Sequence, residues 1–336
     1  MLLFSVGPEP HVREVTGLAE GIAFLEWLDN GTRVVGYNWA AHAYEILGVD
    51  AGVADRIYTT FAPQPSADAN QRSEWAHVLP GGKAILLEHD GGPPRVYDVA
   101  TGDMHTFTPP PGQNVVFTAT KDGAQLIFNN IVEGRSRVMM SDLDGANARV
   151  LAANKNGSVG MIDGDAVSPD GQYLLLSSSD GSGSDQQTTV IVTDLNGVTL
   201  WRPAVPDIQA GIATEVRWAG PAELLVTETK PDGHGDIVVA SKFVSVPSGT
   251  ETLPIEDLTL RLVSLSPDGQ HAIMRLGDGP AAWNRRCALV RIDSVSGSVV
   301  ELAAANPGPG DYQTVFCATV DWTPNGSEAI VSAGGI

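Results

Sequence analysis

The sequence predicts an all-β fold, a seven-bladed β-propeller with four-stranded antiparallel blades whose closing blade is shared by the N- and C-termini. Three observations predict it. A tight-turn motif recurs along the chain at similar spacing, and the segments around it have the periodicity of strands rather than helices. The two chain ends, in addition, each supply half a blade.

The recurring turn follows the first strand of each expected blade. Proline sets φ at its first position, Asp or Asn bonds back to the backbone, and glycine takes the position with positive φ. Successive copies are 41 to 57 residues apart, near the roughly 40–50-residue period of propeller blades. The copies are Asp29-Asn30-Gly31, Pro80-Gly81-Gly82, Lys121-Asp122-Gly123, Pro169-Asp170-Gly171, Pro267-Asp268-Gly269, Pro324-Asn325-Gly326 and, in degenerate form, Gly220-Pro221-Ala222.

The stretch from Ala166 to Trp201 shows the whole repeated unit. Its turn (SPDG) precedes the strand-like run YLLLSS, and two further strand patterns follow before Trp201. No helical periodicity persists beyond a turn or two anywhere in the chain. We therefore expect a single propeller domain over residues 1–336, with blades at approximately 21–59, 74–108, 115–151, 164–202, 213–253, 258–302, and 317–336 joined by 1–16.

The chain ends provide a separate indication. Only one strand pattern, Glu328 to Ser332, follows the last turn, so the last blade lacks its outer half. At the N-terminus, Leu2 to Val6 and His11 to Val15 supply two more strands. Joining the two ends would close the propeller and remove sheet edges that invite aggregation.

The composition is strongly acidic. Lys and Arg number 20 and Asp and Glu number 40, which gives a formal net charge of −20. Such a charge repels phosphate backbones, so we expect no nucleic-acid partner. It favours cationic partners or divalent metals, and the alternative is a solvated acidic surface that keeps the protein soluble.

The start of the chain and its cysteines bear on compartment. No run approaches the ~18–20 apolar residues of a membrane span, so we expect no membrane insertion. The N-terminus begins with a strand-like run and without a basic leader. We therefore expect a cytoplasmic monomer, or a periplasmic or extracytoplasmic protein if a leader has been removed. A single bridge between Cys287 and Cys317 is conceivable, and two buried thiols are the favoured interpretation.

Three segments carry a resemblance to a known family. Ser168–Gly171 with YLLLSSS and Ser266–Gly269 with HAIMRL resemble the SPDG-plus-strand core of TolB-like, or WD40-like, propeller repeats. Ser141–Asn147 (SDLDGAN) is similar to the D-x-D-G turn of the same repeats. The resemblance implies a bacterial propeller that binds ligands or proteins. It extends to the propellers of prolyl oligopeptidase-type peptidases and to oligogalacturonate lyases.

Those relatives differ in their chemistry. A peptidase of that type needs a following α/β-hydrolase domain, and the sequence contains no G-x-S-x-G. The lyases use a histidine-rich manganese site with an H-x-H pair, which this sequence lacks. TolB carries an additional N-terminal α/β domain and a secretion signal, neither of which is seen here. The resemblance therefore implies a free-standing TolB-like propeller.

Function is expected on the loops at the channel mouth, where the connections between second and third strands meet. They carry indoles for stacking, imidazoles, carboxylates and a guanidinium that can clamp an anion. Packing between sheets and solvated turns are the alternative roles for these side chains. The candidate ligand-binding residues are Trp39, His42, His89, Asp90, His234, Asp236, Trp283 and Arg285.

The sharpest local motif is the run DGHGD at 232–236. Alternate positions of an extended segment put Asp232, His234 and Asp236 on one side, and histidine with carboxylates suits zinc, manganese or iron. The alternative is a glycine-rich hairpin loop of ordinary turn formers. The sequence makes no cofactor certain, and a divalent metal held by these three residues is the candidate.

Two functions stay open on this scaffold. One is a module that binds a small molecule or a protein through the mouth loops. The other is an enzyme at the same mouth, a lyase or a hydrolase or cyclase acting on a small molecule or sugar. The enzyme requires a histidine and a carboxylate with a shifted pKa to converge on one pocket. No Ser-His-Asp order or Cys-His pair can be assembled from the sequence.

Overall fold

A computed structural model of the 336-residue chain describes residues 2–15, 22–29, 31–38, 40–41, 43–49, 52–57, 74–89, 93–161, 166–180, 187–202, 213–231, 236–251, 261–276, 286–292, 298–305 and 317–333. All regular structure in these residues is β-strand. They contain no helix with the length and apolarity needed to cross a bilayer.

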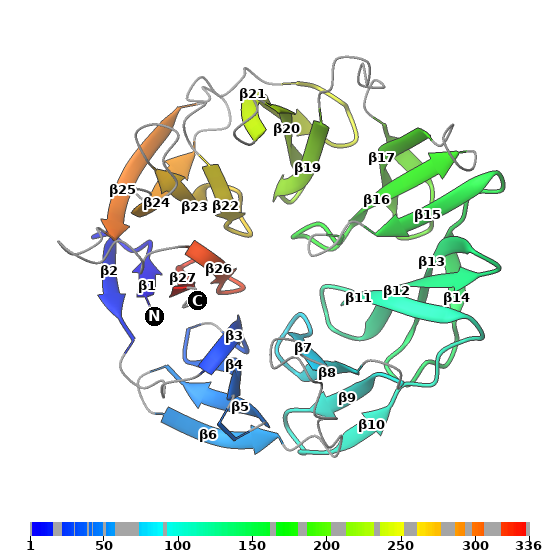
Figure 1. The fold of residues 1–336 in the computed structure, drawn as a ribbon, viewed down its shortest axis with the longest axis horizontal. Coiled ribbons are helices and arrows are strands. Elements are labelled where there is room, and N and C mark those ends of the chain that lie inside the picture. Colours follow the sequence, from blue (N-terminus) through cyan, green and yellow to red (C-terminus); the bar gives the residue numbers. More distant parts are fainter. Residues whose placement is uncertain are drawn as a thin grey trace. The chain divides into compact units, whose positions relative to one another are not determined.

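The strands form seven antiparallel sheets, which are the blades of a β-propeller (Figure 1). Six of these blades have four strands each. The fifth has three strands in the described residues, and a single bridge joins Val244 to Glu251 where the fourth strand was expected. The predicted fold class, an all-β seven-bladed propeller, is confirmed.

The chain divides into two compact units, which are described separately. The first comprises residues 1–39, 45–55 and 204–336, and it holds blades five and six, the closing blade and most of blade one. The second comprises residues 40–44 and 56–203, and it holds blades two, three and four.

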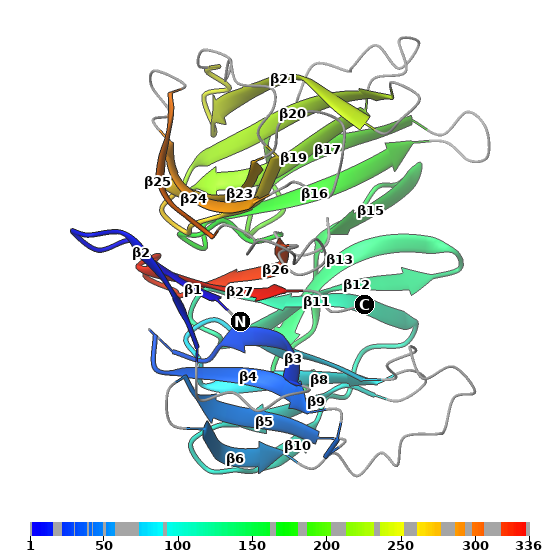
Figure 2. The ribbon, with the colours of Figure 1, turned by 60° about the vertical axis from the view of Figure 1, so that its left-hand side comes forward.

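In the second unit consecutive strands pair with each other, so each blade is an up-and-down antiparallel sheet (Figure 2). Blade two consists of β7 (Glu74–Val78), β8 (Ala84–His89), β9 (Arg95–Asp98) and β10 (Met104–Thr106). Blade three consists of β11 (Gln113–Ala119), β12 (Gln125–Val132), β13 (Arg135–Asp142) and β14 (Arg149–Ala152). Blade four consists of β15 (Gly157–Met161), β16 (Tyr173–Asp180), β17 (Gln187–Asp194) and β18 (Thr199–Trp201).

Blade four begins earlier than its turn motif suggests. Its first strand, β15, ends at Met161, ahead of residue 164, where the blade was expected to begin. The apolar Val167 adds only a single bridge, to Leu174 in β16. Residues on both sides of the segment 162–165 therefore pair with the same second strand.

In the first unit the same up-and-down order recurs. Blade one consists of β3 (Ile22–Trp27), β4 (Arg33–Asn38), β5 (Ala43–Gly48) and β6 (Gly52–Ile57). Blade five consists of β19 (Ala213–Gly220), β20 (Glu223–Pro231) and β21 (Asp236–Ser245). Blade six consists of β22 (Arg261–Leu265), β23 (His271–Leu276), β24 (Arg286–Ile292) and β25 (Val299–Ala305).

The closing blade joins the two chain ends, as the sequence predicts. It contains β1 (Leu2–Ser5), β2 (His11–Glu14), β26 (Cys317–Trp322) and β27 (Glu328–Ala333), in the order β2-β1-β27-β26. Leu3 lies opposite Ile330 and Phe4 opposite Ala329, and all four side chains are buried. Since burying a large apolar side chain contributes about 1.5–3 kcal/mol, this seam holds the termini together.

One cysteine differs from its expected state. Cys287 is buried in β24, and its sulfur is disulfide-bonded. The expectation of a free buried thiol at this position is therefore wrong. The only other cysteine of the chain is Cys317, at the start of β26. The repeat pattern could not decide the matter, because bridging depends on the separation and direction of two Cβ atoms.

Three phenylalanines show how neighbouring blades of the second unit pack. Phe107, just after β10 of blade two, lies edge-on to Phe117 and Phe128 of blade three, with ring centroids 5.7 and 5.4 Å apart. Phe117 and Phe128 stack on each other at 5.5 Å. Offset-stacked and edge-to-face rings gain about 0.5–1.5 kcal/mol beyond their burial. Aromatic contacts therefore join the outer strand of blade two to the inner strands of blade three.

The repeated SPDG turns are alike in structure as well as in sequence. The Ser168 hydroxyl donates to Asp170 Oδ1 at 2.6 Å and accepts from the backbone N–H of Tyr173 at 2.9 Å. Ser266 donates to Asp268 at the same 2.6 Å distance. These bonds satisfy backbone groups at the start of the second strand, as side chains in turns commonly do.

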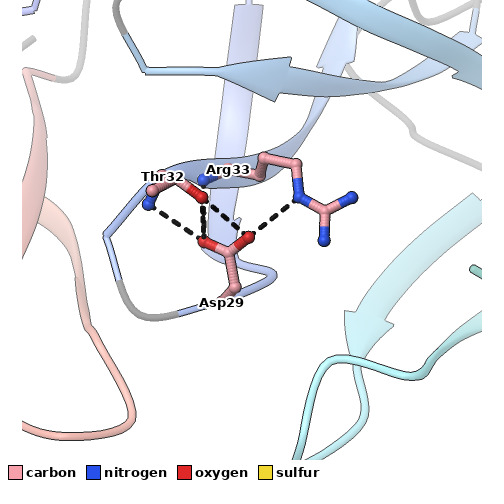
Figure 3. A network of polar contacts seen from close by, with 3 residues as sticks. All are labelled: Asp29, Thr32 and Arg33. Carbon is pink, nitrogen blue, oxygen red and sulfur yellow. Dashed lines mark hydrogen bonds and ion pairs between the residues drawn. The ribbon is translucent and has the colours of Figure 1, made fainter.

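In blade one, Asp29 lies one position after the one that serine occupies in these turns, and it accepts from the equivalent backbone N–H groups (Figure 3). Asp29 Oδ1 accepts from the backbone N–H groups of Thr32 and Arg33 at 2.9 Å, and Asp29 Oδ2 accepts from Arg33 Nε at 2.8 Å. Partial burial raises the pKa of Asp29, but the hydrogen bonds from Arg33 and Thr32 outweigh it, so the net shift is downward. The ion pair is partly solvated and contributes about 0–1 kcal/mol, so its main effect is to shape the turn.

Two of the turn glycines also seat one blade against the preceding one. Gly269 has a φ of +71°, and a Cβ there would lie 1.4 Å from the carbonyl oxygen of Ala219 in blade five. Gly123 has a φ of +68°, and its Cβ would lie 2.4 Å from the Pro80 carbonyl oxygen of blade two. Glycine is thus required both for backbone conformation and for close approach. These turns hold one end of the second strands in place.

Candidate functional site

Buried polar side chains gather at one end of the second strands. This is the end that leads into the third strand, and we call it the loop end. At the other end, beside the turns, the same strands bury apolar residues such as Val34, Leu126 and Leu174. Buried polar groups are costly unless they are hydrogen-bonded, so their partners define the site. The buried polar residues at the loop ends are Asn38 in β4, Asn129 and Asn130 in β12, and Ser178 and Ser179 in β16.

Blade three holds the most connected group. Asn130 is fully buried, and its Nδ2 donates to Asn114 Oδ1 at 2.8 Å while its Oδ1 accepts from Arg137 Nε at 2.9 Å. Its neighbour Asn129 accepts a backbone hydrogen bond from Met161 of blade four at 2.9 Å. Three strands of one blade and the first strand of the next are therefore tied together at this loop end.

In blade four the loop end is held by a side chain from the connection that precedes the blade. Asn154 Nδ2 donates to the Ser179 carbonyl at 3.0 Å and to Asp180 Oδ1 at 2.7 Å. Asn154 Oδ1 in turn accepts from the backbone N–H of Asn156 at 3.0 Å. The chain entering blade four is thereby fixed against the end of β16.

In blade one the equivalent position pairs an amide with a carboxylate. Asn38 Nδ2 donates to Glu45 Oε1 at 3.1 Å across the β4–β5 connection, and both residues are buried. A buried carboxylate that accepts a hydrogen bond fixes its neighbours in one arrangement. The loop end of blade one is thus ordered in the same manner as those of blades three and four.

Blade two places a carboxyl group near an imidazole. Glu88, near the end of β8, lies opposite Trp75, and His77 lies opposite Leu86, so Glu88 and His77 are diagonal neighbours on one face. Glu88 Oε1 is buried and has no hydrogen-bond partner among the described residues. Burial raises the pKa of Glu88, and the nearby His77 opposes the rise only in part. A carboxyl with a raised pKa beside an imidazole is a candidate for general acid–base chemistry.

A second carboxyl group with a shifted pKa lies between the first strands of the closing blade and blade one. Asp321, in β26, accepts from the backbone N–H of Trp27 at 2.5 Å, and Trp27 Nε1 donates to the Asp321 carbonyl at 3.1 Å. Burial of the carboxyl, with a smaller contribution from the charge of Glu26, raises the pKa of Asp321 to about 7. The residue as a whole is only half-buried, so the enclosure applies to the carboxyl group.

These ionisable residues were missed at the sequence level, although a signal for them exists. Glu26, His77, Arg217 and Asp321 all lie five positions before the last residue of the turn in their blades. The repeat thus places them at equivalent points of their first strands. Their burial could not be foreseen, because it depends on side chains of the neighbouring strands.

The predicted mouth residues lie at or between second and third strands in the chain order. His89 ends β8 and Asp236 begins β21, where its backbone pairs with that of Pro231. The side chains of both fall outside what the structure describes. The other predicted residues lie wholly outside it: Trp39, His42, Asp90, Asp232, His234, Trp283 and Arg285.

Within the described ranges no group of three or more His, Cys, Asp or Glu side chains could hold a metal ion. The proposed ligands Asp232, His234 and Asp236 were outside that search, since their side chains are not described.

No protein-family profile matches the chain, and no curated protein matches it. The chain does match solved structures. An oligogalacturonate lyase from Vibrio parahaemolyticus is similar at 10% identity, with 98% of this chain and 92% of that chain covered and a TM-score of 0.61. An oligogalacturonate lyase in complex with manganese is similar at 13% identity, with 91% and 84% covered and a TM-score of 0.58.

A putative TolB from Agrobacterium tumefaciens is also similar, at 18% identity, with 78% of this chain and 90% of that chain covered and a TM-score of 0.47. At that TM-score the likeness supports no closer relationship. The two lyase structures support the fold and nothing about function, because one fold hosts many activities. Together with the seven sheets, they identify the chain as a seven-bladed β-propeller.

Proposed function

We propose that this protein is a binding module that takes a small molecule or a protein at the loop ends of its blades. The observation that carries the proposal is the gathering of buried polar side chains at the loop ends, while the turn ends of the same strands bury apolar ones. Hydrogen bonds such as that from Arg137 to Asn130 hold these strand ends in place. Binding loops need such rigid starting points.

The proposed contacts come from the connections that follow these strand ends. Indoles offer flat faces for a sugar, an aromatic ligand or a cation, and a guanidinium can clamp a carboxylate or phosphate. A divalent metal at Asp232, His234 and Asp236 belongs to the same proposal. The residues are Trp39, His42, His89, Asp90, His234, Asp236, Trp283 and Arg285.

The net charge of −20 argues against a nucleic-acid partner. The disulfide at Cys287 favours an oxidising compartment, because such bonds are rare in the reducing cytosol. We therefore favour a periplasmic or extracytoplasmic location over the cytoplasmic one. Thiol labelling of protein taken directly from cells tests this, since labelling of Cys287 in the native protein would contradict it.

The binding proposal can be tested without knowing the ligand. In protein labelled with 5-fluorotryptophan, the seven tryptophans can be assigned one at a time by substitution. A panel of sugars, sugar acids, amino acids and Mn²⁺ is then added. We expect a ligand to shift the ¹⁹F signals of Trp39 or Trp283. The signals of Trp27 and Trp322, both buried in first strands, should not move.

Variants give the matched comparison. His234→Ala and Trp283→Ala should lower affinity for any ligand found in this way. The exposed Lys121, in a turn at the opposite end of the strands, serves as the control in Lys121→Ala. Equal affinity in all three variants, or shifts confined to the buried tryptophans, would overturn the proposal.

An enzyme acting on a small molecule or sugar is the second candidate, and Glu88 beside His77 is the observation that favours it. A carboxyl with a raised pKa and an imidazole on one face are groups that can donate and abstract protons. Oligogalacturonate, which the two lyases of similar fold are named for, is the substrate to try first.

The test follows formation of an unsaturated product by ultraviolet absorbance, with and without added Mn²⁺. If the chain is a lyase, Glu88→Gln should lose activity, while Glu301→Gln, at an exposed position in β25, should keep it. Absence of product from the wild-type protein under both conditions would exclude oligogalacturonate as a substrate. The binding proposal would then stand alone.

A further inference from the structure

A cavity of about 440 Å³ lies between the outer part of blade three and the face of blade four, wholly within the second unit. Leu151 of β14 and Ala153 contribute one side. Val159 of β15 and Ile191 of β17 contribute the other. Ligand cavities span roughly 300–1,000 Å³, so this one has room for a compact small molecule.

The walls of the cavity are fixed before any ligand arrives. Asn154 anchors the connection between the two blades through its hydrogen bonds to Ser179 and Asp180. On the blade-four side, Gly197 has a φ of +82°, and a Cβ there would lie 1.8 Å from the Leu151 carbonyl oxygen. The backbones of the two blades therefore meet at this point.

The cavity is lined by two positively charged side chains in a protein of net charge −20. Lys155 and Arg202 are both exposed, and neither forms an ion pair with another described residue. The one acidic group in the lining, Asp180, already accepts a hydrogen bond from Asn154. Two cations against one carboxylate leave the lining with a net positive charge, which favours a ligand that carries a negative charge.

The other residues that line the cavity narrow the chemical class of the ligand further. Leu151, Val159 and Ile191 form an apolar part, whereas Ser178 and Thr199 add hydroxyl groups. Asp180 has acceptor capacity left for a hydroxyl of the ligand. An apolar surface, hydroxyl partners and two cations together match a ring that bears both hydroxyl groups and one anionic group.

We propose that this cavity between blades three and four is a binding site for a small hydroxylated anion, a sugar phosphate or a sugar acid. Lys155 and Arg202 bind the anionic group, and Arg202 can do so with two parallel hydrogen bonds. The ring lies on the apolar part of the lining. The residues that line the cavity include none of the proposed loop residues at 39–42, 89–90, 234–236 and 283–285, and the proposal does not depend on them.

Isothermal titration of the full chain at about 0.15 M salt, where the Debye length is about 8 Å, tests the proposal. The probes are glucose 6-phosphate, glucuronate and uncharged glucose. We expect at least one charged probe to bind with a millimolar or tighter dissociation constant and glucose not to bind. The stronger of the two charged probes then distinguishes a sugar phosphate from a sugar acid.

Variants locate the binding. Lys155→Gln and Arg202→Gln should each weaken it at least about fivefold, and Arg202→Lys should recover part of the loss. Ala153→Trp should abolish binding by filling the cavity, and Ala153 is exposed enough for the indole to be accommodated. The control is Lys83→Ala, which removes an exposed cation of blade two that does not line the cavity.

Three results would overturn the proposal. The first is that neither charged probe titrates at about 20 mM. The second is that glucose binds as well as the charged probes. The third is that Lys155→Gln, Arg202→Gln and Ala153→Trp all leave binding unchanged. If His234→Ala abolished binding while these variants kept it, the anion would belong to the loop residues, so the two proposals can fail separately.

Discussion

Asp321 accepts two hydrogen bonds from Trp27, one on its side chain and one on its backbone. The Trp27 backbone N–H donates to Asp321 Oδ2, and the Trp27 indole N–H donates to the Asp321 carbonyl oxygen. The pair joins β26, the first strand of the closing blade, to β3, the first strand of blade one. Both strands belong to the first unit. Because the carboxyl group is enclosed and near Glu26, this junction is sensitive to ionisation.

The first prediction concerns the pH dependence of stability. Asp321 has a pKa of about 7 in the folded protein, against an ordinary value of 3.8. The folded state therefore binds the proton more tightly, so its contribution is fully present below pH 3.8 and is lost as the pH rises through about 7. Asp321→Asn, which cannot ionise, should remove this decline and raise the free energy of unfolding above pH 7 by up to about 4 kcal/mol.

Urea titrations between pH 4 and pH 8 measure this effect. Asp194→Asn is the control, because hydrogen bonding from the Val198 backbone lowers the pKa of Asp194 and its contribution is lost only as the pH falls. The prediction fails if the stability of wild type and Asp321→Asn changes in parallel across the range.

The second prediction concerns the closing blade. Deleting residues 328–336 removes β27, which pairs with both β1 and β26. β1 and β26 then lose their shared neighbour, and the apolar surface of Leu3 and Phe4 becomes exposed. We expect loss of cooperative thermal unfolding by circular dichroism. Removing only residues 334–336, which leaves β27 intact, should change little, and an unaltered melt of the longer deletion would contradict the two-plus-two blade.

The third prediction concerns Gly269. Alanine there must adopt a φ of +71° and place its Cβ 1.4 Å from the Ala219 carbonyl oxygen, so the turn has to move away from blade five. Gly269→Ala should therefore lower the free energy of unfolding by at least about 2 kcal/mol. Gly7→Ala is the matched control, since no atom lies within 4 Å of its Cβ position. Chemical denaturation compares the two, and equal stability would show that the turn does not rest on blade five.

The fourth prediction follows from charge. With 20 basic and 40 acidic residues, we expect the chain to lack the basic stripe that phosphate backbones need. We expect no shift of a random DNA duplex or of single-stranded RNA by micromolar protein at physiological salt. Salt-sensitive retardation at that concentration would show that basic residues gather on one face despite the net charge.

The sequence by itself determined the number of blades and how the chain closes. Both rest on local chemistry that a linear reading can follow. A turn such as Ser168–Gly171 is stabilised by bonds between residues a few positions apart. Alternating apolar residues then give each strand a buried face wherever the strand is placed. The pairing of Leu3 with Ile330 was foreseeable too, because each chain end supplied half a blade.

Only the tertiary structure decided the chemistry of particular groups. The pKa of Asp321 is raised by burial and then by the charge of Glu26, which is almost 300 residues away in the sequence. The disulfide at Cys287 depends on the meeting of two Cβ atoms. The cavity beside Lys155 depends on how blade four packs against blade three. Each is a property of the space between elements, and a repeat pattern specifies the elements but not the side chains that face one another across that space.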